Sequence, residues 1–199
     1  LNHNIAVVYK EIYDYPSALE LFNKALEMTE EIGDRYSSSV SLKNIGEIYR
    51  IQGKYSDSLD AHKASLKIRQ ELELSDYIGE SLNLLALTYF LSNDLDEASK
   101  YINKAKEVKL QDDDQSALRD LYEILISGEV TNEDLIKHII TDIERNQNIT
   151  YETNYFLYLV TNEVRYQNLA KDYIKEAEKN HPKSCELSKY PIPATVLKL

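Results

Sequence analysis

Apolar and small side chains recur along the first half of the chain with a period of forty residues. Three segments each place a branched aliphatic residue, then a tiny residue, then a tyrosine three positions later. Nine residues after each tyrosine, an alanine or serine begins a second set of small and bulky residues at three- and four-residue spacing. The three sets are Ile5, Ala6, Tyr9, Ala18, Phe22 and Ala25; Ile45, Gly46, Tyr49, Ser58, His62 and Ser65; and Leu85, Ala86, Tyr89, Ala98, Ile102 and Ala105.

This spacing is that of two helices packed as a hairpin, because residues three and four apart share one face of a helix. The tiny residue lets the second helix approach closely, and the tyrosine fills the space beside it. Short breakers separate the helices: Pro16 suits the first turn of a helix, and Gly53 suits a left-handed helix end. The sequence therefore predicts three hairpins, at about 1–34, 35–74 and 75–110.

The repeat weakens over residues 111–180, where the pattern predicts helices at about 115–127, 132–147, 151–163 and 166–180. The last of these carries an apolar stripe, formed by Leu169, Ala170, Tyr173, Ile174 and Ala177. Two interpretations are open: two degenerate hairpins, or a packed helical cap that shields the end of the stack. Residues 181–199 contain three prolines and predict an extended tail, which packs on the last hairpin, leads to another domain or enters a neighbour's groove.

The three units keep the same register, and in this they resemble the tetratricopeptide repeat family. The likeness is to the forty-residue variety, as in Pins-type polarity scaffolds, the Rap and PlcR peptide receptors and kinesin light chains, and it covers residues 1–110. It implies an all-α, right-handed solenoid whose first helices line a concave face. Two features depart from the family: Asn2, Leu42 and Leu82 replace its tryptophan, and its usual proline after the second helix is absent.

The resemblance also implies a function, which is to bind a protein or an extended peptide in the concave groove without catalysis. The polar candidates for ligand contact are Asn4, Lys10, Lys43, Asn44, Glu47, Arg50 and Asn83. Asn4 and Asn44 recur at the same place, and in Rap-type and Pins-type relatives the matching asparagine pairs with one peptide unit of an extended ligand. The alternative is that these asparagines cap or bridge water, and that the basic residues pair with Glu11 and Glu47.

An apolar anchor is expected next to the polar residues, at Leu84, Leu87, Phe90 and Leu91. If the last three were exposed, they would form a patch that monomers rarely tolerate without purpose. The alternative is that the degenerate end folds over them. Chaperone-binding relatives hold a ligand's C-terminal carboxylate with a Lys/Asn/Arg clamp, but only Asn44 fits that pattern here, so no chaperone-tail binding is expected.

Composition narrows the classes of partner. The 199 residues carry a formal charge of -11, and no segment is strongly basic. Such a surface repels phosphate backbones and anionic lipids, which excludes nucleic acid and membrane surfaces as expected partners. No run of about 18 apolar residues encodes a membrane span. The single cysteine, Cys185, indicates a reducing compartment, so a cytoplasmic location is expected.

The sequence offers little for catalysis. His62 stands at a bulky core position, so packing is expected of it rather than chemistry. Asp134, His138 and Asp142 share one helix face, which is typical of a solvated surface more than of a metal site. A His181–Cys185 dyad would sit on a proline-flanked tail, which positions a base poorly. We therefore expect no enzyme, no cofactor and no metal.

Two further hypotheses concern assembly. The helical pattern starts mid-helix at Leu1, which favours, as the second reading, the sensor or regulatory arm of a larger signalling protein such as a transcription regulator or histidine kinase. A third reading is a homo-oligomer, formed by residues 190–199 or by the open first hairpin. Light scattering at two concentrations tests it, because a concentration-independent monomer mass removes it.

Overall fold

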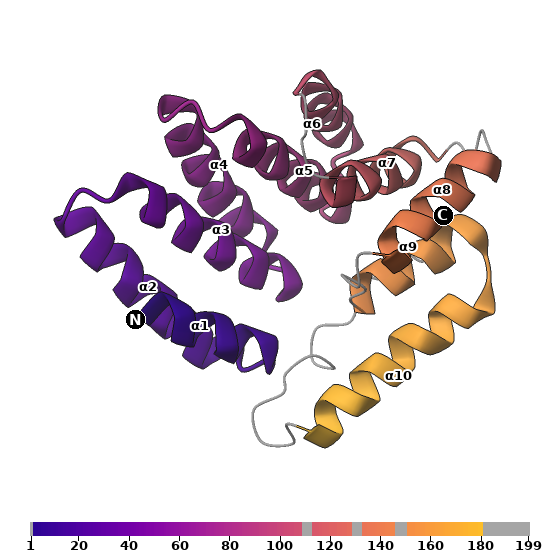
Figure 1. Cartoon of the computed structure of the whole chain (residues 1–199), viewed down its shortest axis with the longest axis horizontal. Coiled ribbons are helices and arrows are strands. Elements are labelled where there is room, and N and C mark those ends of the chain that lie inside the picture. The colour runs from indigo at the N-terminus through magenta and orange to yellow at the C-terminus, as the bar shows by residue number, and fades with distance from the viewer. Residues whose placement is uncertain (1, 109–112, 129–132, 146–150, 181–199) are drawn as a thin grey trace.

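The computed structural model describes residues 2–108, 113–128, 133–145 and 151–180, and these are all helical or in short turns. The helices are α1 (Asn2–Glu11), α2 (Tyr15–Glu31), α3 (Arg35–Ile51), α4 (Tyr55–Glu71), α5 (Ser75–Leu91), α6 (Leu95–Glu107), α7 (Asp113–Ser127), α8 (Glu133–Arg145), α9 (Tyr151–Thr161) and α10 (Val164–Asn180). Consecutive helices pack on one another from α1 to α8 and again from α9 to α10, in sequential hairpins. The prediction of an all-α stack of helical hairpins is therefore confirmed (Figure 1).

The turns between the first six helices follow a twenty-residue rhythm. Helices α2 to α5 span 17 residues each, and three residues separate consecutive helices. One residue of each turn has positive φ, and these are Tyr13, Gly33, Gly53, Glu73 and Asn93. The left-handed end predicted at Gly53 is confirmed by its φ of 73°, and Pro16 lies in the first turn of α2 as predicted.

Aspartates cap three of the helices that follow these turns. The carboxylates of Asp14, Asp34 and Asp94 each accept a hydrogen bond from the backbone N–H three residues later. An N-terminal cap of this kind satisfies a backbone N–H that the helix itself leaves without a partner. The two other helices in this series, α4 and α5, begin after Lys54 and Leu74 and have no side-chain cap.

The second hairpin shows why a tiny residue is needed where the two helices meet. A Cβ atom on Gly46 of α3 would lie 2.6 Å from Cε1 of His62 on α4, which is too close for any real contact. His62 is fully buried, and neither ring nitrogen has a hydrogen-bond partner in the described part of the chain. Burial lowers the pKa of His62 to about 3, so the ring is neutral at pH 7. The prediction of a packing histidine is confirmed.

The C-terminal helices both continue the hairpin pattern and cover the end of the stack. Their bounds lie within two residues of those predicted, and α7 pairs with α8 as α9 pairs with α10. Helix α7 packs on α5 and α6, and α9 packs on α7. One core cluster joins Leu87 and Phe90 of α5 to Leu121 of α7, Ile139 of α8 and Phe156 of α9.

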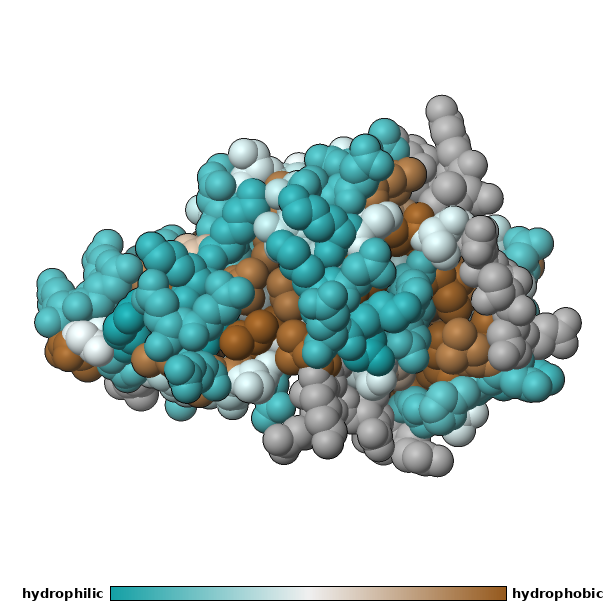
Figure 2. Space-filling model, turned by 90° about the horizontal axis from the view of Figure 1, so that it is seen from above, coloured by the Kyte–Doolittle hydropathy of each residue, from teal (hydrophilic) through white to brown (hydrophobic). Residues whose placement is uncertain are grey.

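The last described helix turns back toward the first hairpin. Figure 1 shows α8, α9 and α10 folded round so that α10 runs toward the α1–α2 hairpin. The rings of Tyr13, in the α1–α2 turn, and Tyr173, on α10, meet edge to face with centroids 6.4 Å apart. On the face in Figure 2, apolar residues reach the surface in separate patches between hydrophilic ones. In the described part of the chain, no helix is both long and apolar enough to cross a membrane.

Candidate functional site

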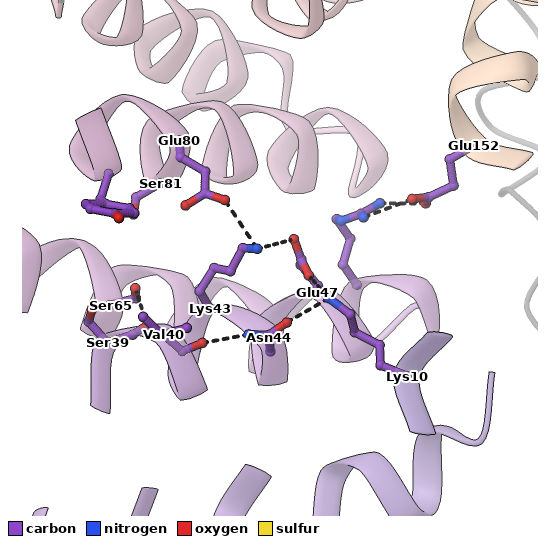
Figure 3. Close-up of polar contacts among 12 residues, drawn as sticks. Lys10, Ser39, Val40, Lys43, Asn44, Glu47, Ser65, Glu80, Ser81 and Glu152 are labelled. Atoms are coloured by element: carbon purple, nitrogen blue, oxygen red, sulfur yellow. Dashed lines mark hydrogen bonds and ion pairs between the residues drawn. The ribbon is translucent and has the colours of Figure 1, made fainter. Parts of the chain in front are cut away.

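A row of charged side chains crosses the inner face of the first three hairpins. We call it the charged row: Lys10 on α1, Lys43 and Glu47 on α3, Arg69 on α4 and Glu80 on α5. Figure 3 shows Lys43 and Glu47 projecting from one side of α3, with Lys10 approaching from α1 and Glu80 from α5. The register of the repeat brings the three first helices side by side, so that side chains of opposite charge meet between them.

Distances in the row are those of hydrogen-bonded ion pairs. The Lys10 ammonium lies 2.7 Å from Glu47 Oε2 and also donates to Asn44 Oδ1 at 2.7 Å. The Lys43 ammonium lies 3.2 Å from Glu47 Oε1 and 3.2 Å from Glu80 Oε1. Ion pairs therefore run without a break from α1 to α5.

The electrostatics of the row keep Lys43 and Glu47 charged at neutral pH. Glu47 raises the pKa of Lys43 to about 12 against the opposing effect of burial, and Glu80 adds to the rise. Burial alone would raise the pKa of Glu47, but Lys43 and Lys10 together hold it well below its usual range. The inner face is thus a fixed pattern of alternating charges.

Arg69 extends the row into the stack. Its side chain is fully buried between α4 and α5, and its Nη1 donates to Glu80 Oε2 at 2.9 Å, Ser81 Oγ at 2.7 Å and the Tyr77 carbonyl at 2.8 Å. Sequence reasoning missed this residue because Thr29 stands at the same place forty residues earlier, so no repeated position indicates it.

A second ion pair joins the repeats to the C-terminal helices. Arg50 of α3 donates from Nη1 to Glu152 Oε1 at 2.6 Å and from Nη2 to Oε2 at 3.0 Å. The side chains are 6% and 16% exposed. Burial opposes the charge on Arg50, but Glu152 outweighs it and raises the pKa of Arg50. Burial raises the pKa of the neighbouring Tyr122 on α7, so its hydroxyl is neutral.

Two hollows lie on either side of this pair. One of about 360 Å³ reaches from Lys10 to Tyr13, Tyr15 and Tyr173. The other, of about 320 Å³, is lined by Lys43, Glu80, Asn83, Leu84 and residues of α7 and α9. Glu47, Arg50 and Glu152 line both hollows. A third hollow of about 470 Å³ lies between the ends of α1, α2 and α3, but no charged residue lines it.

The asparagines predicted to contact a ligand differ in how far they are exposed. Asn4 is exposed on α1, whereas Asn83 is buried at 2% exposure. Asn44 is 4% exposed; its Nδ2 donates to the Val40 carbonyl of its own helix, and its Oδ1 accepts from Lys10. The amide of Asn44 is therefore already used inside the protein, next to the partly exposed side chains of Lys10, Lys43 and Glu47.

The prediction of an apolar anchor on the inner face needs correction, because most of its residues are buried. Leu87, Phe90 and Leu91 are 1%, 5% and 4% exposed, and they belong to the core that α7, α8 and α9 complete. The C-terminal helices fold over these side chains, so they form no open patch. Leu84 is half-buried and lines the smaller hollow.

The residues weighed for metal binding or catalysis are not gathered into a site. In the described ranges, no group of three or more His, Cys, Asp or Glu side chains could hold a metal ion. His138 pairs with Asp142 at 3.2 Å, while Asp134 faces Lys137 at 3.6 Å on the surface of α8. His181, Cys185 and the tail 190–199 lie outside the described residues.

Comparison with known proteins agrees with the repeat. The model of the tetratricopeptide repeat family matches residues 1–71 and, in a second overlapping match, residues 38–111. The two matches together cover more than half of the 199 residues. No curated protein matches the chain.

Proposed function

Because the chain belongs to the tetratricopeptide repeat family, we propose that it is a non-catalytic module that binds a protein or an extended peptide along its concave face. Repeats of this family generally serve as protein-binding scaffolds, and a stacked array offers an extended surface for that purpose. The observation that carries the proposal for this chain is the charged row, with Asn44 and Arg50 beside it.

The charged row suits an extended ligand because its groups are both charged and held in place. Lys10, Lys43 and Glu47 keep part of their surface open, while their mutual ion pairs fix their side-chain conformations. A binding surface that is already ordered loses less conformational entropy when a ligand arrives. Hydrogen bonds to charged groups contribute about 1.5–3 kcal/mol each, so two or three of them give useful affinity.

The hollows give room for side chains of such a ligand. Their volumes of about 360 and 320 Å³ fall at the lower end of the range found for ligand pockets, roughly 300–1,000 Å³. Leu84 supplies an apolar wall to the smaller hollow, in place of the larger anchor that the C-terminal helices cover. The proposed ligand is thus held mainly by polar contacts.

Affinity capture from a source-cell lysate, read by quantitative mass spectrometry, tests the proposal. The test variant is Lys43→Ala/Glu47→Ala, which removes an i,i+4 ion pair from the charged row. The matched control is Glu20→Ala/Lys24→Ala, which removes an i,i+4 ion pair from the exposed side of α2. Circular dichroism and thermal melting establish that both variants remain folded.

We expect a partner that the wild type and the control retain and that the charged-row variant loses by about tenfold or more, as the loss of one or two charged hydrogen bonds implies. A partner that all three proteins retain equally would place binding elsewhere and refute the proposal. The absence of any specific partner would refute it as well.

A further inference from the structure

Arg50 and Glu152 meet although 102 positions separate them in the sequence. Both nitrogens of the guanidinium fork face both oxygens of the carboxylate, which is the strongest geometry for an arginine–carboxylate pair. Glu152 projects from α9 across the inner face toward α3, as Figure 3 shows. The contact therefore places a carboxylate from the C-terminal helices on the face for which we propose ligand binding.

The pair lies at the border between the two hollows. Both hollows include Arg50, Glu152 and Glu47 in their walls, so the pair borders both spaces. The Arg50 Nε atom has no hydrogen-bond partner in the described part of the chain, although it is buried. Arg50 thus retains one donor that the described residues leave unused.

Charge limits what could replace Glu152 on Arg50. The inner face has four cations, at Lys10, Lys43, Arg50 and Arg69, against four carboxylates, at Glu11, Glu47, Glu80 and Glu152. With Glu152 withdrawn, four cations face three carboxylates, so the face carries a net positive charge. A buried charge left without a partner is strongly destabilising, so a group that displaces Glu152 must itself be anionic.

We propose that Arg50 recognises a carboxylate of the bound ligand, and that Glu152 occupies its place as an internal substitute in the free protein. The proposal rests on the proposed function, because it assigns the ligand chemistry at one point of the same groove. The ligand carboxylate pairs with the Arg50 fork, and Glu152 is released. No bond forms or breaks beyond these ion pairs.

The rest of the fold allows this exchange. Helix α9 is held on α7 by contacts such as the edge-to-face pair of Phe156 and Tyr122, with centroids 6.1 Å apart. These contacts lie in the core and do not depend on Glu152. Tyr13 and Tyr173 join the far end of the hairpin α9–α10 to the first hairpin. Release of Glu152 therefore loosens one edge of α9 and leaves its packing on α7 in place.

The test compares Glu152→Gln with wild type. Glutamine keeps an oxygen that accepts from Arg50 but loses the charge, so it competes less well with a carboxylate. The matched control is Glu123→Gln, which changes an ion pair of 2.7 Å between Lys106 on α6 and Glu123 on α7, away from the groove. The probes are the acetylated peptides Ac-(Glu-Gly)4-NH2, Ac-(Gln-Gly)4-NH2 and Ac-(Gln-Gly)4-OH, titrated by calorimetry.

We expect Glu152→Gln to bind Ac-(Glu-Gly)4-NH2 about tenfold or more tightly than wild type and Glu123→Gln do. A gain with the free-acid peptide alone would assign the site to a chain-terminal carboxylate, and a gain with the glutamate peptide assigns it to an acidic side chain. Equal affinity in wild type and Glu152→Gln, or an equal gain with the amidated glutamine peptide, would overturn the inference.

A second measurement on the unaltered chain covers the case in which Glu152→Gln does not fold. The Nε–Hε resonance of Arg50 should shift when the glutamate peptide is added to labelled wild-type protein at millimolar concentration. A constant resonance under those conditions would contradict the inference. If both measurements fail while Lys43→Ala/Glu47→Ala still loses its captured partner, the carboxylate inference is wrong and the proposed function stands.

Discussion

The buried, neutral His62 makes the stability of this protein depend on pH. In the unfolded chain the histidine pKa is near its ordinary value of 6.5, whereas burial lowers the folded-state pKa to about 3. Glu47 favours the charged ring, but Arg50, Lys43 and Arg69 oppose it. Because the folded-state pKa is the lower one, His62 leaves stability intact above pH 6.5 and reduces it as the pH falls toward 3.

The size of the effect follows from these two pKa values. Between pH 7 and pH 5 the unfolded chain gains a proton at His62 and the folded chain does not, which lowers the free energy of unfolding by about 2 kcal/mol. Substitution His62→Phe removes the titrating group, and Phe22 already fills the same position in the first hairpin. We expect the variant to lose about 2 kcal/mol less than wild type over that range.

Urea unfolding at pH 7, 6 and 5, followed by far-UV circular dichroism, measures the difference. Other groups titrate in the same range, including His3, whose pKa is lowered by burial and by Lys10, so the comparison between variants isolates His62. His138→Gln is the control, because His138 is exposed on α8. The reasoning is refuted if wild type and His62→Phe lose the same stability between pH 7 and pH 5.

Three further predictions concern the packing and the turns, and urea unfolding tests each of them. Gly46→Ala should destabilise the protein by about 1–3 kcal/mol, since the added Cβ meets His62. His62→Ala in the same chain should relieve most of that loss, and the contact is contradicted if the two losses in unfolding free energy simply add. Glu73→Gly should stabilise by about 0.5–1 kcal/mol because its φ is 56°, and no gain would show that the turn is unstrained. Leu87→Ala should cost about 2–5 kcal/mol and half-buried Leu84→Ala much less; equal costs would argue against the cover over Leu87.

The first six helices could be predicted from local spacing alone. A tiny residue such as Gly46 and a bulky one such as His62 recur at fixed distances, and the same distances set where two helices of one hairpin touch. The turns are predictable for a similar reason, because Pro16 and Gly53 carry backbone preferences that act within a few residues. The charged row was partly predictable, since Lys43 and Glu47 fall on one side of a predicted helix.

The ion pairs and the burial of the inner face were harder to predict from the sequence. Nothing in the pattern pairs Arg50 with Glu152, because the repeat has lost its register before α9 begins. Arg69 could not be predicted for a different reason. It lies on the second helix of its hairpin, whereas the first helices line the predicted groove, and its partners come from the next hairpin. Leu87 and Phe90 were recognised as apolar, but what covers them depends on α7 and α9.

The amino-acid pattern alone therefore establishes the repeat, its hairpins and the family, since these depend on interactions between residues within about forty positions of one another. The tertiary structure decides which inner-face groups are open to a ligand. It does so because the C-terminal helices turn back over the stack, burying Leu87, Phe90 and Leu91 and setting Glu152 against Arg50. The positions of those helices depend on packing and charge over a hundred residues or more, and no local periodicity encodes that distance.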